Sequence, residues 1–80
     1  MRVKIKTQYG NIETEVSETS RIQDLIDTVV KNFLLRKRGH YVIGKQNSVF
    51  IEFAKSYTLA ECGIKDGEEL WFIDYRKDNE

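Results

Sequence analysis

The stretch TLAECGIKDGEEL at residues 58–70, followed at once by Trp71-Phe72-Ile73, decides the fold of this chain. Leu59 and Ile64 are spaced as the two apolar ends of a short helical turn, and we expect both to pack under a sheet. Asp66-Gly67 is a strong turn dipeptide, because glycine adopts a positive φ without steric cost. The apolar run after it predicts a final strand.

Two strands at the N-terminus are predicted by alternation of polar and apolar residues. Residues 2–7 read RVKIKT, so Val3 and Ile5 share one face and the basic side chains share the other. Residues 12–16 alternate in the same way. Tyr9-Gly10-Asn11 between them is a turn signal, so we expect a hairpin.

A helix is predicted next, because the apolar period changes from two to about 3.6 residues. The residues that follow this spacing are Ile22, Leu25, Ile26, Val29, Val30 and Phe33. Ser20 is a good N-cap, with Gln23 three positions later as in a capping box. Gly39 is placed to end the helix in a left-handed conformation.

The remaining strands are shorter. We expect them over residues 40–43, 49–53 and 70–75, with a turn at 44–48. The order is then a hairpin, a helix, a return to the sheet and a final strand parallel to the first. This order predicts an α+β domain in which one helix packs across a mixed sheet of four to five strands.

Over residues 1–75 the chain resembles the ubiquitin-like β-grasp superfamily. The resemblance is carried by the opening hairpin with Gly10, by Ile22 at the helix start, by Gly44-Lys45-Gln46, and most specifically by residues 58–70. It implies a ubiquitin-like β-grasp fold for residues 1–75. Residues 76–80 (RKDNE) would then form a charged tail.

The charged end of the chain is not a terminal Gly-Gly, which modifiers and sulfur carriers of this superfamily use to react. The stretch LAECGIKDGE at residues 59–68 is similar to the near-terminal segment of the YukD/EsaB type, small bacterial proteins of type VII (ESX-like) secretion. That resemblance implies a non-conjugated adaptor or regulator. The charged tail after Ile73 departs from family members that end at the last strand.

Composition narrows the class of protein further. Eighty residues make one small domain, and thirteen basic and thirteen acidic side chains cancel. A neutral total argues against general binding of nucleic acid or membranes, so we expect neither a nucleic-acid partner nor membrane insertion. The single Cys62 forms no intrachain disulfide. We therefore expect a cytoplasmic protein.

The final strand supplies the candidate binding residues. If Leu70 and Phe72 face the core, alternation puts the next residues on the open face of the sheet. The resemblance to ubiquitin adds one tyrosine on the third strand and a basic rim that includes His40. The predicted protein-binding residues are Tyr41, Trp71, Ile73, Tyr75, Lys4, Lys6 and Lys45. We expect a protein partner that binds with Trp71 as the anchor. Cytosolic parts of a secretion complex are among the candidate partners. The alternatives are a homodimer through this face, or cover by the chain itself.

The only basic run, Arg36-Lys37-Arg38, has two interpretations. It could contact an anionic partner such as an acidic protein, RNA or phospholipid. It could instead complement the dipole at the helix end, which is the commoner role of such charges.

No arrangement of residues predicts catalysis, a metal or a cofactor. Cys62 reads as structural filler, and His40 has no ligand partner at the right spacing. Two other functions stay open at this stage. One is a covalent modifier or sulfur carrier, and the other is an RNA- or ribosome-associated module that uses Arg36-Lys37-Arg38.

Overall fold

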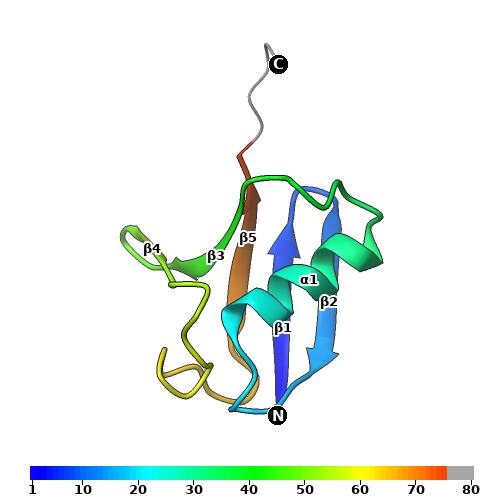
Figure 1. Cartoon of the computed structure of the whole chain (residues 1–80). Coiled ribbons are helices and arrows are strands. Elements are labelled where there is room, and N and C mark those ends of the chain that lie inside the picture. The colour runs from blue at the N-terminus through cyan, green and yellow to red at the C-terminus, as the bar shows by residue number, and fades with distance from the viewer. Residues whose placement is uncertain (76–80) are drawn as a thin grey trace.

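A five-stranded mixed sheet and one helix form the two layers of the structure, a computed structural model that describes residues 1–75 (Figure 1). The elements are β1 (Arg2–Thr7), β2 (Gly10–Glu15), α1 (Ile22–Asn32), β3 (Tyr41–Gln46), β4 (Phe50–Glu52) and β5 (Glu69–Asp74). The strand order is β2-β1-β5-β3-β4, with β5 parallel to β1 and antiparallel to β3. The predicted α+β β-grasp class is confirmed. The predicted tail at 76–80 lies outside the described residues.

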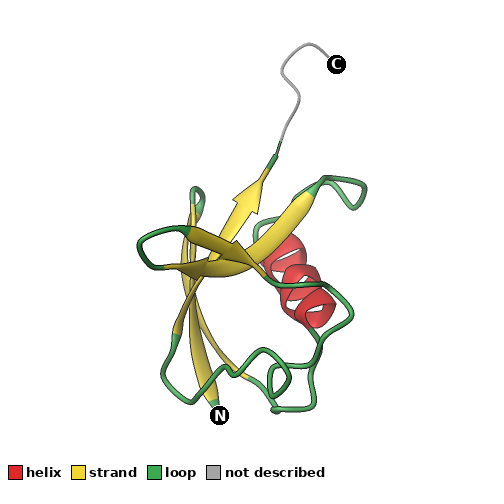
Figure 2. Ribbon diagram, turned by 90° about the vertical axis from the view of Figure 1, so that its left-hand side faces the viewer, coloured by secondary structure: helices red, strands yellow, loops and turns green. Residues whose placement is uncertain are grey.

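The core lies between α1 and one face of the sheet (Figure 2). Val3 and Ile5 of β1 and Leu70 and Phe72 of β5 point into it, as their alternation predicts. The other core residues come mainly from α1, β3 and the segment after β4, and are Ile22, Leu25, Ile26, Val29, Tyr41, Ile43, Leu59 and Ile64. Within residues 1–75, α1 covers only this face, and no second layer packs on the other face of the sheet.

The turn that closes the core has the predicted form. The backbone N–H of Cys62 donates to the Thr58 carbonyl at 3.1 Å, which makes one helical turn, and the N–H of Ile64 donates to the Leu59 carbonyl at 3.0 Å. Leu59 and Ile64 are both buried. At the following turn, Asp66 Oδ1 accepts from the Arg2 N–H at 2.7 Å, so this segment is tied to the first strand.

Several boundaries differ from the sequence prediction. The hairpin turn is Gln8–Tyr9 and Gly10 already belongs to β2, paired with Thr7. At the helix start, Arg21 is the N-cap residue and Asp24, not Gln23, accepts from its N–H at 2.9 Å. The predicted cap on Ser20 is wrong, because its hydroxyl accepts from the Ser17 N–H instead.

The helix also ends earlier than predicted. It stops at Asn32, and the residue with a left-handed backbone is Leu34, with φ of 55°, not Gly39. Gly39 has another role, because a Cβ at this position would overlap the ring of Tyr41. The run at residues 36–38 therefore lies in the loop after the helix, and its predicted place at the helix end is wrong.

The strands of the second half are shifted along the chain. β3 runs through Gln46, across most of the predicted turn at 44–48, and β4 is shorter than predicted. Glycine at position 44 weakens the strand signal in the sequence, yet its backbone pairs with Glu52 of β4 and with Trp71 of β5. Gly44 therefore lies at the centre of this part of the sheet.

Candidate protein-docking surface

The final strand divides its side chains between the two faces of the sheet. Leu70 and Phe72 are buried in the core, whereas Trp71 and Ile73 are half-buried and do not belong to the core cluster. Tyr75, just beyond the strand, is 50% exposed. Trp71, Ile73 and Tyr75 therefore lie on the outer side of β5, away from α1, as alternation indicates.

The predicted place of Tyr41 on this outer face is wrong. Tyr41 is 4% exposed, stacks on Phe72 with ring centroids 5.3 Å apart, and donates its hydroxyl to the Arg36 carbonyl. The cause is the strand register, which pairs Tyr41 with Asp74 and so gives it the parity of Phe72. A shift of one residue moves a side chain to the opposite face of a sheet.

Val42 takes the outer position that was predicted for Tyr41. It pairs with Ile73 across the β3–β5 ladder and is 2% exposed, although it is no part of the core cluster. A side chain that is buried outside the core must be covered by its neighbours on the outer face. Side chains on this face therefore already pack against one another.

Phe50 completes this surface, and the sequence analysis missed it. Gly44 lies opposite Trp71, and a Cβ at Gly44 would come within 2.6 Å of Phe50 Cζ and would overlap the backbone oxygen of Ile51. The Phe50 ring thus covers Gly44 beside Trp71. Glycine inside a strand often marks such a close approach, so Gly44 was the available signal. We define the outer-sheet surface as Val42, Phe50, Trp71, Ile73 and Tyr75.

One of the two lysines beside this surface is paired within the chain. Lys6 Nζ lies 5.3 Å from the centroid of the Trp71 ring and 3.3 Å from Glu69 Oε2. Lys4 is exposed and lies opposite Glu13 in the β1–β2 register. Glu69 therefore neutralises Lys6, whereas Lys4 forms no ion pair within residues 1–75.

Lys45 and His40 complete the predicted rim. Lys45 alternates with Gly44, so it leaves β3 on the opposite side from Trp71, and it forms an ion pair with Glu68. The hydrogen bond from Lys45 holds the pKa of Glu68 below its ordinary value, although partial burial opposes this shift. The His40 ring meets the edge of Tyr75 with centroids 5.7 Å apart.

The loop run at residues 36–38 lies away from the outer-sheet surface. Arg36, Lys37 and Arg38 are all exposed, and none forms an ion pair within residues 1–75. The loop follows α1, which packs on the inner face of the sheet (Figure 1). These residues therefore belong to the loop between α1 and β3 and not to the outer-sheet surface.

The chemistry of the remaining polar residues is modest. Cys62 is half-buried, and burial together with the charge of Glu61 raises the pKa of its thiol, which disfavours the reactive thiolate. Thr58 donates hydrogen bonds from its N–H and hydroxyl to Glu61, which lower the pKa of that carboxyl. Residues 1–75 contain no group of three or more His, Cys, Asp or Glu side chains that could hold a metal ion. Within the same residues, α1 is too short and too polar to cross a membrane.

Comparison with known proteins identifies the fold and no family. No protein-family model matches this chain, and no curated protein matches it. Among solved structures, the crystal structure of ATBAG1 in complex with HSP70 is similar, with a TM-score of 0.77 and 18% sequence identity over 92% of this chain. The chain spans 40% of the length of that protein chain. At this identity the similarity shows the fold alone, and one fold serves many functions.

Proposed function

We propose that this chain is a non-catalytic adaptor or regulator that docks reversibly onto another protein through its outer-sheet surface, with Trp71 as the anchor. The observation that carries the proposal is the contact of Phe50 with Gly44 beside Trp71, on the sheet face that α1 does not cover. Large aromatic side chains supply most of the binding energy in protein interfaces. A contiguous apolar patch with a polar border is the composition expected of such a site.

The outer-sheet surface is also preorganised. Trp71 and Ile73 sit on β5, which is hydrogen-bonded to β1 on one side and to β3 on the other. A surface held by two neighbouring strands loses little conformational entropy when a partner binds. The lysine next to Trp71, Lys6, is paired with Glu69, so the partner should present an apolar patch to Trp71 more than a charged one. A small domain offers at most a standard-sized interface, so the affinity should be modest.

The partner that the sequence resemblance suggests is a cytosolic part of a type VII secretion apparatus, which would place this chain in the cytoplasm. The support for this finer assignment is the similarity of residues 59–68 to the YukD/EsaB type. The similar structure of ATBAG1 was solved in a complex with HSP70, which fits a docking role for a protein of this fold.

The direct test is affinity capture with the wild-type chain and two alanine variants. Trp71→Ala should reduce capture of a specific partner by about thirtyfold, the effect of losing one interface anchor. Tyr57→Ala is the matched control, because Tyr57 is as exposed as Tyr75 and lies outside the outer-sheet surface. It should capture the partner as well as wild type does. Normal capture by a folded Trp71→Ala variant would reject the proposal.

Two other outcomes are distinguished by the same proteins. If the outer-sheet surface forms a homodimer, sedimentation of the pure wild-type chain will show a concentration-dependent mass that Trp71→Ala abolishes. If the chain is a covalent modifier, mass spectrometry will find ATP-dependent adducts of it on other proteins. Either result, without a docked partner, would reject the adaptor function in favour of the homodimer or the modifier.

A further inference from the structure

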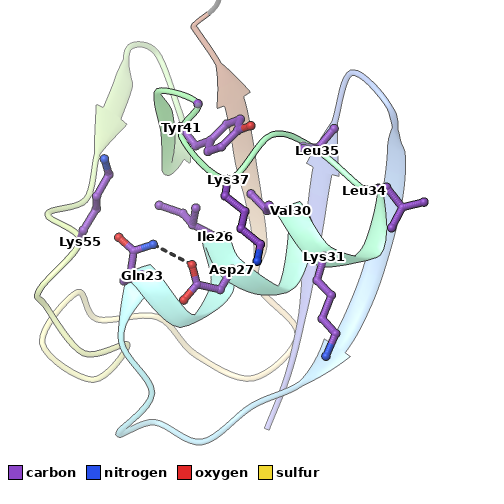
Figure 3. Close-up of a pocket in the computed structure, with 11 residues that line it drawn as sticks. Gln23, Ile26, Asp27, Val30, Lys31, Leu34, Leu35, Lys37, Tyr41 and Lys55 are labelled. Atoms are coloured by element: carbon purple, nitrogen blue, oxygen red, sulfur yellow. Dashed lines mark hydrogen bonds between the residues drawn. The ribbon is translucent and has the colours of Figure 1, made fainter.

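A second surface lies on the opposite side of the domain, where α1 meets the loop that follows it. A hollow of about 700 Å³ opens there between the helix, the loop and the start of β3 (Figure 3). Its apolar lining includes Val30, Leu35 and Tyr41. Lysines from three segments of the chain surround this lining, and they are Lys31 on α1, Lys37 in the loop and Lys55 after β4 (Figure 3). We call this site the helix-end hollow.

Leu34, at the edge of the hollow, is unusual for a leucine in both its backbone conformation and its exposure. The helix ends in a Schellman motif, in which the Leu35 N–H donates to the Val30 carbonyl at 2.9 Å and the Leu34 N–H donates to the Lys31 carbonyl at 3.4 Å. Leu34 occupies the left-handed position of this motif, with φ of 55°, where glycine is usual. Its side chain is 90% exposed.

A leucine gives the folded chain no advantage over glycine at this position. The left-handed backbone is strained for leucine and not for glycine, and the exposed side chain returns no burial energy. Residues that break a local rule without a structural gain are most often found at functional sites. Leu34 is therefore placed to contact something outside this chain.

The charges at the hollow are unbalanced, in contrast to the neutral total of the whole chain. Lys31, Lys37 and Lys55 form no ion pair within residues 1–75. The single carboxylate in the lining belongs to Asp27, whose Oδ1 accepts from Gln23 Nε2 at 2.9 Å (Figure 3). The exposed Arg36 and Arg38 add positive charge to the same loop. The electrostatic complement of this site is an anion.

We infer that the helix-end hollow binds an acidic segment of a partner protein, with apolar side chains of that segment against Val30, Leu34 and Leu35 and its carboxylates beside the lysines. The apolar lining favours a peptide over a simple anion. RNA is disfavoured, because the one aromatic ring in the lining, Tyr41, is already stacked on Phe72. A membrane surface is disfavoured, because the site is concave and membrane anchoring needs more than one exposed leucine.

The experiment is a titration of the whole isotope-labelled chain, followed by backbone amide chemical shifts. The probe is a synthetic peptide of leucine and glutamate residues in helical spacing. We expect shifts at the amides of α1, of the loop to Tyr41 and of Lys55, and none at Trp71. Replacing the glutamates of the peptide with lysines, or its leucines with serines, should abolish the shifts.

Variants of the chain separate the charge of the hollow from its apolar contact. Lys31→Glu with Lys37→Glu should weaken binding by about tenfold, because two charge contacts become repulsive. Leu34→Gly should weaken binding and leave the chain at least as stable, so loss of folding cannot explain the result. Lys4→Glu, at the outer face of the sheet, is the matched charge control and should bind the peptide normally.

Trp71→Ala should also bind the acidic peptide normally, so this inference and the proposed docking through Trp71 can fail separately. Three results would overturn the inference. They are shifts confined to the outer-sheet surface, equal binding of the lysine peptide, and tighter binding of the hollow to polyuridylate or to phosphatidylserine vesicles than to the acidic peptide.

Discussion

The two surfaces of this domain both combine apolar side chains with lysines, and they differ in whether the lysine nearest the apolar residues is paired. On the outer-sheet surface, Lys6 is bound to Glu69 and rests over Trp71. At the helix-end hollow, Lys31 and Lys37 have no ion-pair partner within residues 1–75. A neutral chain can therefore hold one surface suited to apolar contact and another suited to anions, and its net charge reveals neither.

The largest expected effect comes from the glycine that shapes each surface. Gly44→Ala should lower the free energy of unfolding by about 2–3 kcal/mol, because the new Cβ meets the Ile51 backbone and the Phe50 ring, and the backbone cannot easily move. Gly39→Ala should cost less, because its Cβ meets a side chain, the Tyr41 ring, and no backbone atom, so the ring can shift at the expense of its contact with Phe72. Urea denaturation measures both. Equal losses for the two variants would show that Gly44 is not held against a fixed strand.

Salt should separate the two modes of binding. Raising the salt from about 0.05 M to about 0.5 M shortens the screening length roughly threefold. Binding of the acidic peptide at the hollow should then fall by about tenfold, because its lysines are exposed, whereas capture through Trp71 should change by less than about twofold. An equal loss of binding with salt for both interactions would contradict the proposed difference between the two surfaces.

Leu34 provides a smaller and more local test. Leu34→Gly should raise the free energy of unfolding by about 0.5–1 kcal/mol, because glycine removes the left-handed strain. The gain is smaller than the strain itself, because glycine also gives the unfolded chain more conformational entropy. Leu34→Ala should give no such gain, since alanine keeps the strain. Thermal unfolding of the three proteins measures the difference. A destabilised Leu34→Gly would mean that the leucine side chain supports the fold.

The smallest effect concerns the ion pair of Lys45 and Glu68. Because the pKa of Glu68 is lowered in the folded chain, its contribution is present above the ordinary glutamate pKa and is lost as the pH falls through the lowered value. Lys45→Met should lose less than about 1 kcal/mol at neutral pH, since the pair is partly exposed. The difference in stability between the two proteins should disappear once the pH has fallen below the lowered pKa of Glu68. A difference that persists in acid would assign the effect to packing.

The sequence predicts the parts of this fold that depend on strong periodicity. Alternation in β1 and β5 assigns Val3, Ile5, Leu70 and Phe72 to the core, and the helical spacing from Ile22 to Val29 identifies the inner face of α1. These patterns succeed because burial of one face determines them. They also predict the outer position of Trp71 without knowledge of its neighbours.

The candidate site is less predictable, because it depends on the register between neighbouring strands and on where each helix or strand ends. Tyr41 was assigned to the wrong face because the register between β3 and β5 was not known. Phe50 was missed because Gly44 was assigned to a turn, so the pairing of β3 with β4 that brings Phe50 over Gly44 was not predicted. The early end of α1 has no sequence signal at all, since Leu34 stands where glycine is expected.

The central claim is that another protein docks at Trp71, and site-specific photocrosslinking in living cells tests it most directly. A photoreactive phenylalanine analogue replaces Tyr75, beside the intact Trp71 anchor, in one version of the chain and the equally exposed Tyr57 in the other. The account predicts a discrete adduct with a different protein from position 75 and none from position 57. No adduct at position 75, or an adduct only with a second copy of this chain, would contradict it.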